Sequence, residues 1–155
     1  MNANAQKNGR MFRGKKTMKT VLVFEPDKVL RSLYKEEFEE EGYHVYLVKD
    51  DREALGLLKK TTVNILITEH QFEPTESYTN LLNMAREVKK IPVIILSSHP
   101  RAFIDLEWWG EIEYLNKTSN LDVLKDTMRE MLDYRCCVDN FYRGGRNLKE
   151  QEFYF

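Results

Sequence analysis

The stretch Val63-Asn64-Ile65-Leu66-Ile67-Thr68-Glu69 is an almost continuous apolar run that ends in an acid. A run that is apolar on both faces is typical of a central strand in a parallel sheet, which helices cover on both sides. Similar runs occur at TVLVFE (20–25), PVIILS (92–97) and EYLNK (113–117), and each ends in a polar side chain. We therefore expect parallel strands whose carboxyl ends carry two acids, a hydroxyl and an amine.

Segments with helical periodicity separate these strands. We expect helices at 28–41, 51–60, 79–88, 102–109 and 120–132, together with a short strand at 43–48. Asp27 is suited to cap the first helix, and Gly42 to end it in a left-handed conformation. The alternation predicts a single α/β domain with a flavodoxin-like, doubly wound, five-stranded parallel sheet of order 2-1-3-4-5.

This strand order brings the polar strand ends to one edge of the sheet. Open α/β sheets bind ligands at that edge, beside the point where the strand order reverses. We expect the edge to carry Glu25, Pro26, Glu69, Ser97 and Lys117. The sequence therefore predicts one concave site built from several strands.

Composition and charge indicate one globular domain with two tails. The chain has 155 residues, 42% hydrophobic residues and a net charge of −1. Residues 1–17 contain basic side chains and no acid, so we expect a disordered basic arm there, a domain at 18–133 and an aromatic C-terminal extension at 134–155. The extension could pack on its own domain, pair with a second copy or bind a partner. We find no apolar run with the length of a membrane span and no secretory signal.

The two cysteines, Cys136 and Cys137, are adjacent in sequence. A disulfide framework needs cysteines that are separated along the chain, so we expect reduced thiols. The three histidines show no metal-binding spacing with them. A cytoplasmic location is the expectation.

Taken together, these stretches resemble the receiver domain of two-component response regulators over residues 18–133. The resemblance is carried by VLVFEPD (21–27), EEGY (40–43), NILITE (64–69), IPVIILSS (91–98) and YLNK (114–117), with Arg31 between the first two. It implies that the chain belongs to two-component or phosphorelay signalling.

The resemblance also implies the roles of the polar strand ends. Receivers place two adjacent acids after the first strand and a phosphoacceptor aspartate after the third, which takes a phosphoryl group from a histidine kinase with Mg²⁺. A Ser or Thr and a lysine hold that group, and Ser97 and Lys117 match these positions. Tyr114 matches the aromatic residue whose rotamer reports activation.

The acids depart from the receiver pattern. Glu25 stands at the first acid position, Pro26 at the second, and Asp27 is one position late. Glu69 stands at the phosphoacceptor position with one extra methylene. Mg²⁺ demands near-ideal octahedral geometry, so losing a carboxylate weakens its binding. We therefore expect no bound metal, with Glu25, Glu69 and the Gln71 carbonyl as weak candidates.

We expect a Glu69–Lys117 ion pair in place of a phosphoryl site. That pair would either mimic a phosphoryl group permanently or be a plain internal salt bridge. Both readings predict a stand-alone, atypical receiver that catalyses no reaction and acts through protein contacts.

The partner surface expected from the resemblance is the face of the fourth helix, fifth strand and fifth helix. Trp108 and Trp109 fall in or beside it, and the extension at 134–155 or a homodimer contact could add to it. Two alternatives stay open. One is a receiver phosphorylated on Glu69 with weak Mg²⁺ binding, and the other is an adaptor whose basic arm binds nucleic acid.

Overall fold

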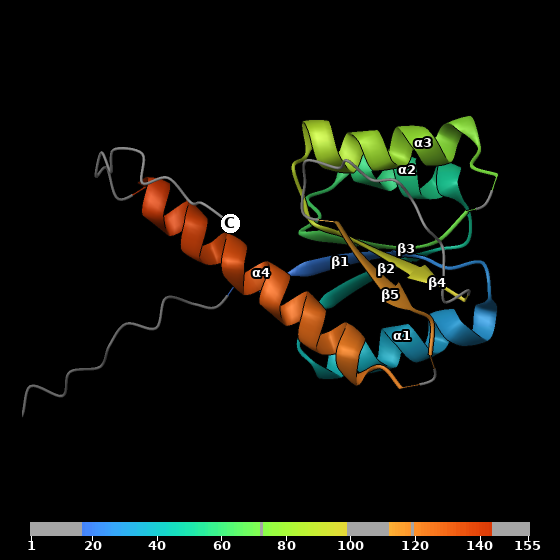
Figure 1. Cartoon of the computed structure of the whole chain (residues 1–155), viewed down its shortest axis with the longest axis horizontal. Helices are drawn as coiled ribbons and strands as arrows, with labels where there is room; N and C mark the ends of the chain where they lie inside the picture. The colour runs from blue at the N-terminus through green and yellow to red at the C-terminus, as the bar shows by residue number, and fades with distance from the viewer. Residues whose placement is uncertain (1–16, 72, 99–111, 119, 144–155) are drawn as a thin grey trace, which may run out of the picture.

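Five parallel strands form one sheet in the order β2-β1-β3-β4-β5, as the sequence predicts. The computed structural model describes residues 17–71, 73–98, 112–118 and 120–143, and the side chains up to 134. The strands are β1 (Thr20–Phe24), β2 (His44–Val48), β3 (Ile65–Glu69), β4 (Val93–Ser97) and β5 (Ile112–Asn116). Each is short, and their carboxyl ends point to the same edge of the sheet (Figure 1).

Helices cover both faces of this sheet (Figure 1). One face carries α1 (Lys28–Glu40) and α4 (Asp122–Arg143), and the other carries α2 (Asp51–Lys60) and α3 (Glu76–Asn83), which continues as the π-helical turn η1 (Met84–Val88). Each face buries its own apolar core, with Phe38 and Met128 in the first and Leu58 and Leu81 in the second. The central strands must be apolar on both faces because both faces are covered.

The first helix ends as its sequence predicts. Gly42 has a φ of +90°, in the left-handed region that glycine adopts without strain. The Tyr43 amide then donates to the Phe38 carbonyl at 3.0 Å, which satisfies a carbonyl in the last turn. This tight ending directs the chain straight into β2.

Two helix boundaries differ from the expectation. α3 begins at Glu76, earlier than the predicted residue 79, because the Thr75 hydroxyl accepts from the Tyr78 amide and caps the helix. α4 continues to Arg143, into the segment that we expected to be a separate extension, and Figure 1 shows it projecting beyond the sheet. The predicted helix at 102–109 and the segment 144–155 lie outside the described residues.

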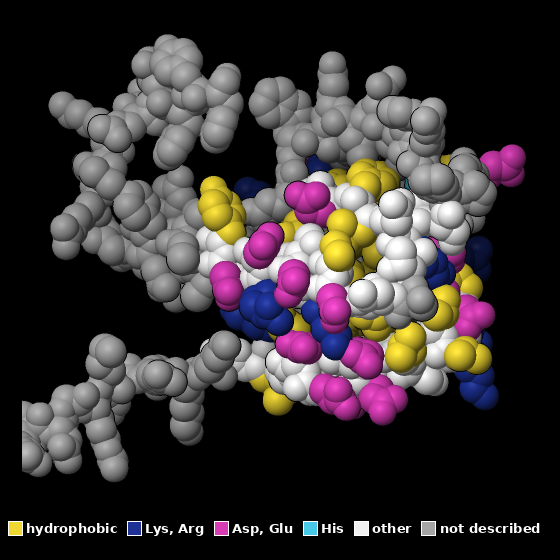
Figure 2. Space-filling model, turned by 60° about the horizontal axis from the view of Figure 1, so that its bottom comes forward, with side chains coloured by type: hydrophobic (Ala, Val, Ile, Leu, Met, Phe, Trp, Pro, Cys, Tyr) yellow, Lys and Arg dark blue, Asp and Glu magenta, His cyan; other side chains and the backbone are white. Residues whose placement is uncertain are grey.

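Ion pairs join α1 to α4. Lys125 binds Glu37 and Glu41, and Arg129 binds Glu41 at 3.2 Å. Figure 2 shows acidic and basic side chains side by side on this face. Within the described part of the chain, no helix has the length and apolar character needed to cross a bilayer.

Candidate functional site

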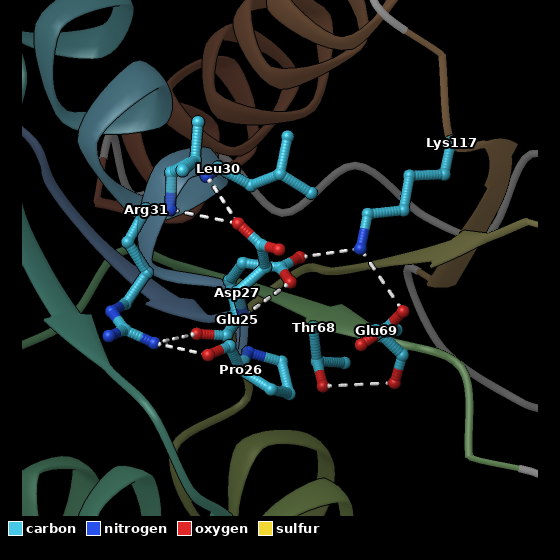
Figure 3. Close-up of polar contacts among 9 residues, drawn as sticks. Glu25, Pro26, Asp27, Leu30, Arg31, Thr68, Glu69 and Lys117 are labelled. Carbon is cyan, nitrogen blue, oxygen red and sulfur yellow. Dashed lines mark hydrogen bonds and ion pairs between the residues drawn. The ribbon is translucent and has the colours of Figure 1, made fainter.

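Three charged side chains meet beyond the carboxyl ends of β1, β3 and β5. Lys117 Nζ lies 2.8 Å from Glu25 Oε2 and 3.1 Å from Glu69 Oε1 (Figure 3). Because β3 and β4 separate β1 from β5, these two strands are about 14 Å apart at the usual strand spacing. Only long side chains can span that distance. The predicted Glu69–Lys117 pair is therefore present, and Glu25 joins it.

The three charges differ in exposure. The Glu25 side chain is 2% exposed, Lys117 is 13% exposed and Glu69 is 27% exposed. Burial lowers the pKa of Lys117, but the hydrogen bonds to Glu25 and Glu69 outweigh this and raise its pKa above the ordinary 10.5. Lys117 therefore stays charged at any physiological pH, as a buried carboxylate requires.

The loop after β1 is fixed by two further contacts. The second oxygen of Glu25, Oε1, accepts from the Asp27 amide at 3.0 Å. Arg31 Nη1 donates to the carbonyls of Glu25 at 2.8 Å and Pro26 at 2.6 Å. Both carboxylate oxygens of Glu25 are thus engaged, and Arg31 holds the loop from the side of α1 (Figure 3).

Asp27 caps α1, as its place in the sequence predicts. Its Oδ1 accepts from the amides of Val29 at 2.8 Å and Leu30 at 3.0 Å. The hydrogen bond from Leu30 is the main reason that the pKa of Asp27 is lowered below the ordinary 3.8. Asp27 therefore serves the helix with this carboxylate oxygen, one position after the place of the second acid.

Replacing Asp27 by alanine is expected to lower the melting temperature by a few degrees at neutral pH, because two amides of the first turn lose their acceptor. The folded-state pKa is lowered, so this stabilisation is present above the ordinary pKa of 3.8 and disappears as pH falls through the folded-state value. Thermal denaturation at several pH values measures it. Asp27→Asn, which still accepts hydrogen bonds, should retain most of the neutral-pH stability. A wild-type advantage over Asp27→Ala that stays constant into acid would contradict this account.

The remaining predicted residues lie around the charged cluster. Ser97 ends β4 and is buried, and its carbonyl accepts from the Lys117 amide at 2.6 Å. Tyr114 in β5 is half-buried, and burial raises its pKa to about 12. Gln71 is partly exposed beyond β3, while Trp108 and Trp109 lie outside the described residues.

One residue at the site is not named in the sequence analysis. The Tyr78 hydroxyl donates to the Glu69 carbonyl at 3.0 Å, and burial raises the pKa of Tyr78 to about 12. Tyr78 belongs to α3, so it ties the end of β3 to the helix that follows. The late helix start expected from the sequence concealed this contact, because it placed Tyr78 in a loop.

The described side chains do not fit the Mg²⁺ ion that a receiver site would hold. Pro26 supplies no carboxylate, Asp27 is turned to its helix, and a lysine ammonium already lies between the two acids. Among the described residues, no group of three or more His, Cys, Asp or Glu side chains is placed to bind a metal ion. Mg²⁺ needs near-ideal octahedral coordination by oxygen, and these side chains offer it too few free carboxylate oxygens.

Comparison with solved structures supports the fold. Response regulator TrrA of Thermotoga maritima, in complex with Mg²⁺ and BeF, is 26% identical with a TM-score of 0.64, over 74% of this chain and 99% of that chain. TrrA bound to histidine kinase ThkA matches with 26% identity and a TM-score of 0.63, over the same shares. A CheY-like receiver domain of Methanospirillum hungatei is 21% identical with a TM-score of 0.68, over 79% of this chain and 99% of that chain.

The sequence itself also matches a family. A search of curated proteins finds no significant match. The model of the response regulator receiver domain, in contrast, matches residues 21–129, which run from β1 into α4. This chain therefore belongs to the response regulator receiver domain family of two-component signalling.

Proposed function

We propose that this receiver domain works without phosphorylation, as a cytoplasmic protein-binding module that catalyses no reaction of its own. The observation that carries the proposal is the single ammonium of Lys117, which binds both Glu25 and Glu69. The carboxylate that would accept a phosphoryl group is already paired. Position 26, next to Glu25, where receivers have a second metal-binding acid, is a proline.

The expected energetic consequence is large. Metal ions stabilise the developing charge of a transferring phosphoryl group by several kcal/mol, and each ~1.4 kcal/mol is a tenfold change in rate. The extra methylene of Glu69 also moves the carboxylate by roughly an ångström, which can cost on the order of a hundredfold. These losses support a site that is not phosphorylated at a useful rate.

The partner is proposed to be a signalling protein that binds around β5 and α4. Val123 and Tyr134, both on α4, are large apolar side chains with exposures of 63% and 65%. β5 lies at the edge of the described sheet. TrrA was crystallised with a histidine kinase, so proteins of the kinase class are the first to test. A second copy of this chain is the alternative occupant.

Beryllofluoride with Mg²⁺ tests the proposal, because this pair occupies an active receiver site as a phosphoryl group does. We expect no saturable change in the amide NMR shifts of Glu69, Ser97 and Lys117. TrrA is the positive control, since its structure contains Mg²⁺ and BeF. Saturable shifts at these three residues, or transfer of one phosphoryl group from acetyl phosphate seen by mass spectrometry, would contradict the proposal.

One observation favours the second candidate, a receiver phosphorylated on Glu69. This side chain is the most accessible of the three, at 27% exposure, and Lys117 lies beside it. Glu69→Gln is the matched control, because the amide keeps the length and cannot form an acyl phosphate. A mass increase that Glu69→Gln abolishes would establish this candidate. The nucleic-acid alternative rests on the basic arm, of which residues 1–16 lie outside the described residues, and it stays a prediction.

A further inference from the structure

We propose that the Lys117 ammonium is the resident cation of this pocket. It takes the place that a divalent metal ion would need, and removal of its charge would turn the Glu25–Glu69 pair into a divalent-cation site. This inference rests on the proposed function, because it explains why the pocket is indifferent to Mg²⁺. It goes further by naming the side chain that keeps the metal out.

The first support is the geometry of the two acids. They come from β1 and β3, which are adjacent in the sheet, and both contact one nitrogen, at 2.8 Å and 3.1 Å. Oxygens that converge on one cation from two sides are the arrangement that a hard metal ion also uses. Figure 3 shows the ammonium between the two carboxylates.

The second support is that Glu25 is held in place without Lys117. Its Oε1 accepts from the Asp27 amide, and Arg31 clamps its carbonyl and that of Pro26. These contacts would survive a substitution of Lys117. The carboxylate would therefore remain buried and directed toward the vacated position, where it needs a cation.

The third support is charge. Glu25, Glu69 and Lys117 together carry −1, so a divalent cation added beside the lysine would change the local charge to +1. That ion would also lie against a partly buried ammonium, which repels it where water screens charges less than in bulk solvent. Without the lysine charge, the same ion would neutralise two carboxylates completely. The two carboxylates thus balance the charge of one cation at most, and the chain supplies that cation.

The α1–α4 face offers a matched control. Lys125 also binds two glutamates, Glu37 in α1 and Glu41 directly after it, but these side chains are 31% and 33% exposed. Removing Lys125 leaves two partly exposed carboxylates that water can reach, and neither is fully buried as Glu25 is. A gain of metal binding that is specific to Lys117 would therefore report the pocket and not a general loss of positive charge.

The test is Mn²⁺ binding to Lys117→Met, measured by electron paramagnetic resonance and by the thermal denaturation of the full chain. We expect the dissociation constant to fall at least about tenfold relative to wild type, with Mg²⁺ competing, and the melting temperature to rise with added Mn²⁺. Lys125→Met should bind Mn²⁺ as weakly as wild type. Lys117→Met combined with Glu25→Gln should lose the gain, because one ligand charge is gone.

Lys117→Gln is the second variant, since its amide donates hydrogen bonds without charge and preserves the fold more readily. The inference is overturned if both Lys117 variants bind Mn²⁺ no more tightly than wild type and neither of them gains folded structure when Mn²⁺ is added. A variant that folds only with Mn²⁺ supports it. The proposed function is tested separately, on the wild-type protein with Mg²⁺ and beryllofluoride. The Lys117 variants play no part in that experiment, so the two ideas can fail independently.

Discussion

Replacing Lys117 by methionine is expected to lower the free energy of unfolding by roughly 3 kcal/mol, the lower end of the range for breaking a buried ion pair. The loss arises because Glu25, 2% exposed, would be left as a buried carboxylate without its main partner. Glu69 adds less, since it is partly exposed and water can solvate it. Urea denaturation without added divalent cations measures the change.

A double-mutant cycle separates the ion pair from simple loss of packing. Glu25→Gln removes the buried charge, so the Lys117→Met substitution should cost much less in that background. We expect an interaction free energy of at least about 1.5 kcal/mol between the two positions. Additive effects would mean that Lys117 stabilises the fold independently of Glu25, through Glu69 or through its own packing. Lys125→Met is again the surface comparison and should change stability little, because exposed ion pairs contribute little.

Alkaline pH offers an independent check on the same cluster. The pKa of Lys117 is raised in the folded state, so its contribution is fully present below the ordinary 10.5 and is lost as pH rises through the folded-state value. The buried tyrosines also titrate in this range, since burial raises the pKa of Tyr34 and Tyr78 to about 12. The relevant quantity is therefore the difference between wild type and Lys117→Met, which should shrink at high pH.

The sheet was predictable because its strands carry a strong signal. Residues 65–67 and 93–96 are apolar at every position, and only a strand covered on both faces requires that. Helix ends were harder. Glu76 and Ser77 look like loop residues until the Thr75 cap is recognised, and the aromatic residues after Asp133 suggested a change of structure where α4 simply continues.

The site was predictable in part for a related reason. Parallel strands bring their carboxyl ends to one edge, so the meeting of Glu69 with Lys117 across β4 was expected from the strand order and the length of the two side chains. The Glu25–Lys117 contact did not follow, because it depends on how far two long side chains reach across β3 and β4. The Arg31 clamp was missed similarly: its role depends on a loop carbonyl, which no side-chain pattern reveals.

Restoring the acids in the double variant Pro26→Asp, Glu69→Asp is expected to create a measurable Mg²⁺ site, with affinity at least about tenfold above wild type. With three carboxylates and Lys117, the pocket would carry −2, which one divalent cation neutralises. The shorter Asp at position 69 would also withdraw from Lys117 by roughly one methylene and leave space for an ion. Mg²⁺ titration followed by amide NMR shifts measures the affinity.

The charge argument and the space argument predict different results for a matched control. Pro26→Asn with Glu69→Asp makes the same space but adds no charge, so it should bind Mg²⁺ little better than wild type. Equal binding by the Asn and Asp variants would show that the length of Glu69, and not the missing charge at position 26, keeps the metal out. A Pro26→Asp, Glu69→Asp variant that does not respond to millimolar Mg²⁺ would mean that Pro26 lies outside the metal-binding part of the pocket, although Arg31 holds its carbonyl beside Glu25. Lys117 is unchanged in both variants. The comparison therefore tests how many carboxylates the pocket needs before it binds Mg²⁺ in addition to the lysine.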